Sequence, residues 1–204
     1  MELSPGIYRH LVRPRILTKI YIENIINDRF DLRDKKVLDF GCGVGAISNM
    51  FLPQNYLGID SDVRRVDYAR KLNQGYNFKV ISENKLPVMD NSVESIVIIA
   101  VLHHIPSETL IDYLQEFKRV LKLNGNVLVI EPCLFENSSV NNWFMECFDN
   151  GKYIRTEDDY ITLFEDHGFK TSLLNKYKKI FYNEIFFSAM PVTANYPHPL
   201  YLWI

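Results

Sequence analysis

The sequence predicts a single α/β domain: a doubly wound, seven-stranded, mainly parallel sheet whose last strand is antiparallel. Three observations support this prediction. Short apolar runs alternate with segments of helical periodicity through the first two thirds of the chain. A turn with three glycines follows the first of these runs. Near the C-terminus, two strand-like runs lack a helix-length segment between them, which predicts an antiparallel hairpin.

The expected elements follow in order along the chain. Strands are expected at about residues 37–38, 56–59, 78–81, 94–101 and 127–130, with the hairpin at 169–177 and 180–189. Helices are expected at about 14–30, 46–51, 63–73, 107–121, 140–148 and 156–167. The β-branched run at 96–99 is typical of a central strand that is buried on both faces.

These elements divide the single domain, residues 1–204, into four parts. We expect an N-terminal helical cap at 1–34, a cofactor-binding core at 35–132, a substrate lid at 133–160, and a C-terminal helix and hairpin at 161–204. The aromatic, proline-broken tail at 195–204 is expected to pack over a surface groove or to form a homodimer.

Composition excludes several classes of partner. A net charge of −2 provides no general attraction to nucleic acid. The longest apolar run is too short to span a bilayer, and the first twenty residues lack the apolar core of a signal peptide. Cys42, Cys133 and Cys147 are odd in number and lack metal-ligand spacing, which favours free thiols in a reducing compartment. We therefore expect a cytoplasmic protein without a membrane or nucleic-acid partner.

The glycine turn is the most specific feature of the sequence. Gly41, Gly43 and Gly45 follow a buried strand, and Asp39 precedes them by two residues. The spacing is G-x-G-x-G, whereas a dinucleotide fingerprint is G-x-G-x-x-G. A carboxylate here repels a pyrophosphate but accepts hydrogen bonds from an amino-bearing, cationic ligand. The alternative is a tight strand-to-helix turn that binds nothing.

A second acidic position follows the next strand. Asp60 lies nineteen residues after Gly41, at the carboxyl end of the expected neighbouring strand. A carboxylate at this distance suits the two hydroxyl groups of a ribose. The alternative role for Asp60 is the N-cap of the following helix.

Taken together, these motifs resemble those of class I S-adenosylmethionine-dependent methyltransferases. Residues 37–45 resemble the first motif of that family, and residues 58–60 resemble its ribose-binding acidic motif. Residues 86–93, 101–104 and 119–132 resemble later blocks, so the similarity extends over about 35–132. It implies the family's seven-stranded fold, S-adenosylmethionine as cofactor and S-adenosylhomocysteine as product.

The resemblance also implies roles for individual residues. The residues expected to surround the methionyl part of the cofactor are Asp39, Gly41, Cys42 and Gly43, with the Ala100 backbone at its amino group. Asp60 would hold the ribose, with Ser61 beside the adenine. Many members have an acidic residue at the position of Ser82 that binds the adenine amino group. Here either the adjacent Glu83 takes that role, or the backbone and a weaker hydroxyl contact do.

The acceptor side is less specific. We expect His103 to face the acceptor as the catalytic residue, because a general base assists transfer to a hydroxyl or an ammonium. Adjacent histidines are expected to point apart, so no metal site is predicted. The substrate-binding residues that we expect are Tyr8, His104, Glu131, Trp143 and Tyr153.

The function expected from these features is methyl transfer to a small-molecule acceptor. The segment 99–102 is not an Asn-Pro-Pro-Tyr-type sequence, which argues against methylation of amino groups on bases or glutamine. A basic surface interleaved with aromatic residues is also missing. Two alternatives stay open: a methyltransferase-like binding protein that has lost catalysis, for which Ser82 is the warning, and a nucleotide-cofactor oxidoreductase.

Overall fold

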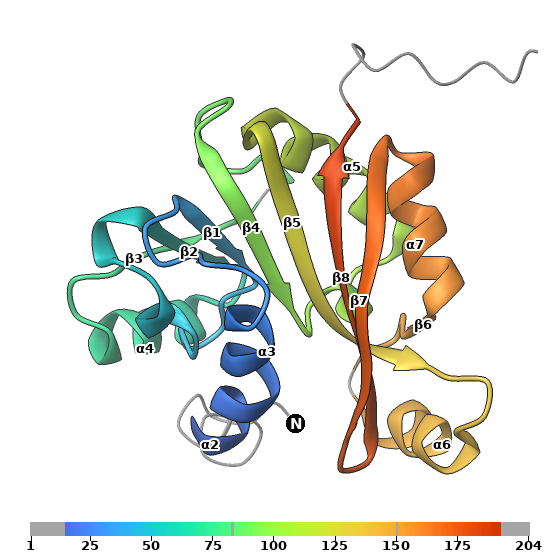
Figure 1. The fold of residues 1–204 in the computed structure, drawn as a ribbon. Helices are drawn as coiled ribbons and strands as arrows, with labels where there is room; N and C mark the ends of the chain where they lie inside the picture. Colours follow the sequence, from blue (N-terminus) through green and yellow to red (C-terminus); the bar gives the residue numbers. More distant parts are fainter. Residues whose placement is uncertain (1–14, 83, 150, 193–204) are drawn as a thin grey trace, which may run out of the picture.

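The computed structural model describes residues 15–82, 84–149 and 151–192, and its centre is one twisted sheet (Figure 1). The strand order is β3-β2-β1-β4-β5-β8-β7. The strands are β1 Val37–Phe40, β2 Tyr56–Asp60, β3 Asn77–Val80, β4 Val93–Ile99, β5 Leu121–Leu134, β7 Phe169–Lys179 and β8 Tyr182–Pro191. β1 to β5 are parallel, and β8 is antiparallel to both β5 and β7. The predicted sheet with its antiparallel last strand is confirmed.

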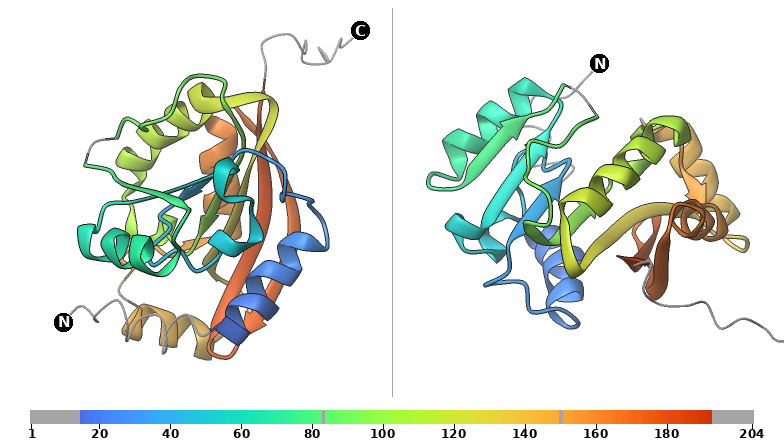
Figure 2. Two further views of the ribbon diagram at one scale, coloured as in Figure 1. Left: turned by 90° about the vertical axis from the view of Figure 1, so that its left-hand side faces the viewer. Right: turned by 90° about the horizontal axis from the view of Figure 1, so that it is seen from above.

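Helices cover both faces of the sheet (Figure 2). They are α2 Arg15–Thr18, α3 Asn24–Asn27, α4 Val63–Leu72, α5 Ser107–Val120, α6 Ser139–Phe148 and α7 Glu157–Asp166. A π-helical turn, η2 Lys19–Glu23, joins α2 to α3, so the described part of the predicted N-terminal helix ends at Asn27. A short strand, β6 Arg155–Thr156, pairs with the end of β5.

Two apolar layers hold these helices to the sheet. On one face, α5 and α7 pack against Ile96 and Ile98 of β4. On the other face, α3 and α4 pack against Val97 and Ile99. Alternate residues of β4 therefore enter different layers, as expected for a strand that is buried on both faces.

The helix predicted at 46–51 is wrong. The chain forms turns there, followed by one 3₁₀ turn, η3 Ser48–Met50, and a second, η4 Pro53–Asn55. Pro53 explains the failure, because the residue before a proline is driven out of the helical region. Leu52 is accordingly extended, with ψ of 134°. Ile47, which precedes η3, also lies outside the helical region, with φ of −108° and ψ of 2°.

The remaining predicted elements are α6, the C-terminal hairpin and the two terminal segments. The helix predicted at 140–148 and the C-terminal hairpin are both found. Tyr8 and the proposed dimerisation tail lie outside the described residues. Among the described residues, none of the helices is long and apolar enough to cross a membrane. The four-part division of the chain stays a prediction.

The capping box of α7 gives a direct test of local stability. Thr156 Oγ1 accepts a hydrogen bond from the Asp159 amide at 3.2 Å, and Asp159 Oδ2 accepts one from the Thr156 amide at 3.1 Å. We expect Thr156→Ala to lower the free energy of unfolding by about 0.5–2 kcal/mol in urea denaturation. Thr162→Ala, on the exposed face of the same helix, is the control. It should be neutral or slightly stabilising, because alanine has the higher helix propensity. Equal losses in both variants would contradict a capping role.

Candidate active site

The glycine turn lies at the carboxyl ends of β1 and β2. The amides of Gly41 and Cys42 donate to the Ile59 carbonyl at 2.8 and 2.9 Å, which ties the turn to β2. Gly41 has φ of +73°, and a Cβ there would lie 2.4 Å from Val101 Cγ2. Gly43 has φ of +53°, but no heavy atom lies within 4 Å of its Cβ position. The turn thus presents open backbone at Gly43, a surface against which a ligand can lie.

Asp60, the last residue of β2, accepts a hydrogen bond from the backbone of the glycine turn. Its Oδ2 accepts from the Gly43 amide at 2.8 Å, and its Oδ1 accepts from the Asp62 amide at 2.8 Å. The N-cap of α4 is Asp62, which accepts from the amides of Arg64 and Arg65. Asp60 is therefore not the cap, and each of its oxygens keeps a lone pair for a further donor.

Asp39 is a buried carboxylate at the centre of the same region. Its Oδ2 accepts from the Tyr56 hydroxyl at 2.6 Å. Burial, and then the Asp39 charge, raise the pKa of Tyr56 well above its usual value, so the phenol keeps its proton. Burial, followed by Asp39 and Asp60, likewise raises the pKa of the Cys42 thiol. Cys42 therefore lies in the site as a protonated thiol, not as a nucleophile.

A second anchored segment follows β4. Ala100 adopts a left-handed conformation, with φ of +53°. Glu131, fully buried on β5, then binds the next three amides: its Oε1 accepts from Val101 at 2.6 Å and from Leu102 at 2.8 Å, and its Oε2 accepts from His103 at 3.3 Å. The 3₁₀ turn η5 Leu102–His104 is therefore wrapped around a single carboxylate.

His103 is held between two carboxylates. Its Nδ1 lies 2.7 Å from Glu131 Oε2, and its Nε2 lies 3.5 Å from Asp149 Oδ1. Asp149 immediately follows α6, and its Oδ2 accepts from the Tyr182 hydroxyl of β8 at 2.9 Å. The chain at Gly151 packs tightly on the ring, because a Cβ there would lie 2.0 Å from His103 Cδ2.

The prediction that the two histidines point apart is wrong. Their ring centroids lie 4.0 Å apart, with 42° between the planes. Neighbouring side chains alternate across an extended strand, but these two residues lie on a 3₁₀ turn, where the rotation per residue is smaller. The residue His104 is exposed as a whole, but its ring is partly covered; this desolvation, and then the adjacent His103, lower its pKa.

Arg155 holds the other side of the same turn and was missed by sequence reasoning. Its Nη1 donates to the Leu102 carbonyl at 3.0 Å, and its Nη2 donates to the Ile105 carbonyl and to Ser107 Oγ, each at 3.0 Å. Asp149 was also missed. Both residues reach η5 through tertiary packing, and nothing in the spacing of the sequence signals it.

The remaining predicted residues lie in different places. Ser61 and Ser82 are exposed, beyond β2 and β3 respectively. The Tyr153 amide donates to the His103 carbonyl at 2.9 Å, so this residue adjoins the cluster. Trp143 is 57% exposed on α6 and contacts Phe148. Tyr8 and Glu83 lie outside the described residues.

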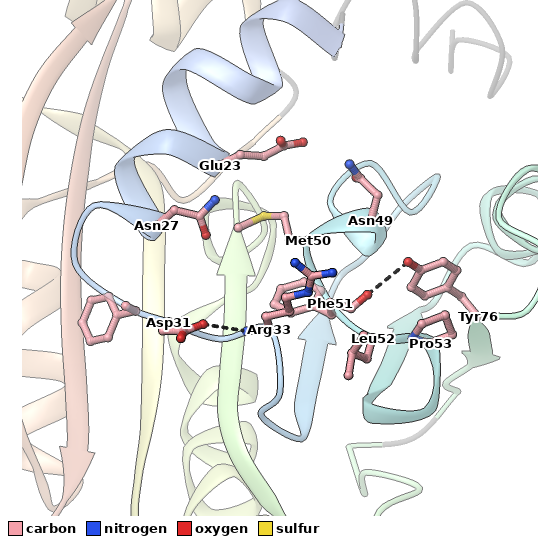
Figure 3. A pocket seen from close by; sticks show the side chains of 11 residues that line it. Glu23, Asn27, Asp31, Arg33, Asn49, Met50, Phe51, Leu52, Pro53 and Tyr76 are labelled. Atoms are coloured by element: carbon pink, nitrogen blue, oxygen red, sulfur yellow. Dashed lines mark hydrogen bonds between the residues drawn. The ribbon is translucent and has the colours of Figure 1, made fainter.

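Two cavities adjoin the N-terminal helix. The larger, of about 590 Å³, lies between α3 and the turns after the glycines (Figure 3). Its lining includes Glu23, Asn27, Arg33, Met50 and Tyr76, and it contains none of the predicted site residues. The smaller, of about 230 Å³, is lined in part by Val44, Gly45 and Ala46 and so adjoins the glycine turn. Like the larger cavity, it contains none of the site residues predicted from the sequence.

Comparison with known proteins relates this geometry to a family. Residues 38–129 match the family model described as a methyltransferase domain. No curated protein matches the sequence.

Solved structures show the same fold. A SAM-dependent methyltransferase from Aquifex aeolicus aligns with a TM-score of 0.68 and 21% identity, covering 92% of this chain and 99% of that chain. Magnesium protoporphyrin IX methyltransferase from Synechocystis, with bound SAH, aligns with a TM-score of 0.64 and 19% identity over 86% of this chain and 82% of that chain. A chain from the Haloferax volcanii complex of the Trm112 methyltransferase activator with a putative methyltransferase aligns with a TM-score of 0.69 and 14% identity, covering 95% and 100%.

The close approach of Gly41 to Val101 can be tested by substitution. We expect Gly41→Ala to lower the free energy of unfolding more than Gly75→Ala does. Gly75 also has a positive φ, of +92°, but no heavy atom lies within 4 Å of its Cβ position. Both variants carry the left-handed strain of about 1–2 kcal/mol, and only Gly41→Ala adds a clash, which costs about 1–3 kcal/mol more. Chemical denaturation of the two variants measures the difference, and equal losses would contradict the clash.

Proposed function

We propose that this chain is a class I S-adenosylmethionine-dependent methyltransferase that methylates a small-molecule acceptor; the match of residues 38–129 to a methyltransferase-domain model and the shared fold support this proposal. One observation carries the proposal. The glycine turn after β1, anchored by Asp60, and the η5 turn after β4, anchored by Glu131, follow two strands that pair in parallel. The carboxyl ends of such strands meet at one edge of the sheet, so a cofactor half and an acceptor half adjoin there.

In the cofactor half, we propose that the open backbone at Gly41, Cys42 and Gly43 contacts the methionyl part of the ligand. S-adenosylmethionine supplies a methyl group on a sulfonium that is already activated for displacement. The buried charge of Asp39 suits a cationic, amino-bearing ligand, and the backbone of Ala100 is the proposed partner of its amino group. The free lone pairs of Asp60 support its proposed role at the ribose hydroxyls. For the adenine we propose Ser61 with either Ser82 or Glu83.

In the acceptor half, we propose His103 as the catalytic residue. The hydrogen bond from Nδ1 to Glu131 leaves the lone pair on Nε2, and that tautomer is inferred from the bonding network. Glu131 is fully buried and its oxygens are bonded to backbone amides and to His103, so we propose that it positions His103 instead of contacting substrate. Substrate contacts are proposed for Tyr8, His104, Trp143 and Tyr153.

The aromatic residues of α6 and the hairpin tip support an acceptor of small-molecule type. Phe144 stacks on Phe181 with ring centroids 4.8 Å apart, and it also contacts Phe148. Apolar rings of this kind line sites for drug-sized ligands, where they provide most of the contact area. The Synechocystis neighbour methylates a porphyrin, which is also a small molecule. Three free cysteines support the proposed cytoplasmic location.

Measurements of cofactor binding test the proposed roles in the cofactor half of the site. Isothermal titration calorimetry with S-adenosylhomocysteine should give one site per chain. Asp60→Asn should weaken binding about ten- to hundred-fold, because the lost charge-assisted hydrogen bonds contribute about 1.5–3 kcal/mol. The control is Asp62→Asn, which alters the N-cap of α4 two residues further on and should leave affinity nearly unchanged. Equal affinity of Asp60→Asn and wild type would refute the ribose assignment.

Measurements of turnover test the proposed roles in the acceptor half of the site. Release of S-adenosylhomocysteine should be measured with a panel of small acceptors that carry hydroxyl, amine or thiol groups. With an acceptor that supports turnover, His103→Ala should lower kcat about 10²- to 10⁴-fold, the usual contribution of a positioned acid–base group. His167→Ala is the control, since His167 bonds the Leu163 carbonyl on α7. Cofactor binding without turnover on any acceptor would instead favour a binding protein that has lost catalysis.

A further inference from the structure

We propose that His103, His104 and Asp149 bind one divalent first-row transition-metal cation. Each of these three side chains offers a ligand atom, and the three atoms lie within 4.8 Å of one another. Two imidazoles and one carboxylate form a donor set that suits zinc and its neighbours in the first row. The cluster joins the turn after β4 to the end of α6.

The hydrogen bonding of Glu131 prepares His103 for this role. Glu131 accepts from three backbone amides, so its oxygens act as acceptors and the fourth bond, at 2.7 Å, requires a proton on His103 Nδ1. Neutral His103 then carries its lone pair on Nε2. Metal-binding histidines almost always donate their other ring nitrogen to a carboxylate or carbonyl in this way.

The environment of Asp149 supplies a second, independent observation. Its Oδ1 accepts from the Gly151 amide and its Oδ2 accepts from the Tyr182 hydroxyl, so the carboxylate is an acceptor on both oxygens. Yet Oδ1 lies 3.5 Å from His103 Nε2. In the tautomer described above, Nε2 has no proton to donate to this oxygen, so both atoms can act as donors of electron pairs to one cation. A tetrahedral cation with bonds of about 2.1 Å separates two of its ligand atoms by about 3.4 Å, which agrees with the observed distance.

His104 completes the set and leaves access from solvent. Its ring lies beside that of His103, and the residue is exposed, whereas His103 is only 3% exposed. Three protein ligands with one further position open are typical of catalytic rather than structural zinc sites. Nε2 of His103 cannot ligate a cation and act as a general base at the same time. If the proposed function holds, a bound cation would therefore replace His103 as the group that activates the acceptor, and its open position would take an oxygen or sulfur atom of the acceptor. Cation binding itself does not depend on that function.

Metal titration of the whole chain tests the site without an activity assay. Protein freed of metal by chelator dialysis is titrated with Zn²⁺ by calorimetry and with Co²⁺ by visible absorption. We expect one cation per chain at this cluster and a Co²⁺ d–d band that is typical of a site with nitrogen and oxygen ligands. His104→Gln and Asp149→Asn should each weaken binding about tenfold or more. His167→Gln removes a histidine outside the cluster and should bind like wild type.

Two outcomes would overturn the proposal: wild type that binds neither cation, or binding that is unchanged in both His104→Gln and Asp149→Asn. Circular dichroism and S-adenosylhomocysteine binding on the same samples show that the variants are folded. Retained S-adenosylhomocysteine binding in metal-free protein would separate failure of the cation site from failure of the proposed cofactor site.

Discussion

A single buried carboxylate, that of Glu131, organises the carboxyl edge of the sheet. An isolated charge in this position would be strongly destabilising, because burial removes its hydration. Glu131 avoids that cost through four hydrogen bonds, three from consecutive backbone amides and one from the His103 ring. The chain after β4 must therefore turn sharply around the carboxylate, which agrees with the left-handed conformation of Ala100.

Both the amides and the carbonyls of the turn η5 are hydrogen-bonded to buried charged side chains. Glu131 accepts a hydrogen bond from the Leu102 amide, and Arg155 donates one to the Leu102 carbonyl. Two buried groups of opposite charge thus hold one peptide segment without forming a direct pair with each other. Backbone groups provide the hydrogen bonds that each buried charge needs, and the same bonds hold the backbone in one conformation. A histidine on such a turn is held in one orientation, which is what a catalytic or ligating imidazole requires.

Features set by local pattern could be predicted from the sequence, and features set by tertiary packing could not. The apolar run of β4, the capping box at Thr156 and the hairpin follow from short-range periodicity and turn chemistry. The helix at 46–51 failed because Pro53 outweighed the apolar spacing. The meeting of His103 with Asp149 depends on how α6 docks beyond β5, and no spacing in the chain encodes it. Beside the glycine turn, the N-cap of α4 could be assigned to Asp62 instead of Asp60 only from their hydrogen bonds.

The position of β8 has a consequence for biosynthesis. This strand inserts between β5 and β7 although it follows both in the sequence. While the chain leaves the ribosome, β1 to β5 and the glycine turn are complete before β8 exists, and one edge of β5 has no partner from the C-terminal hairpin. An unpaired edge strand is a template for association with other chains. The nascent chain is therefore expected to be most prone to aggregate between synthesis of β5 and completion of β8, which pairs with that edge through Glu184 to Ala189.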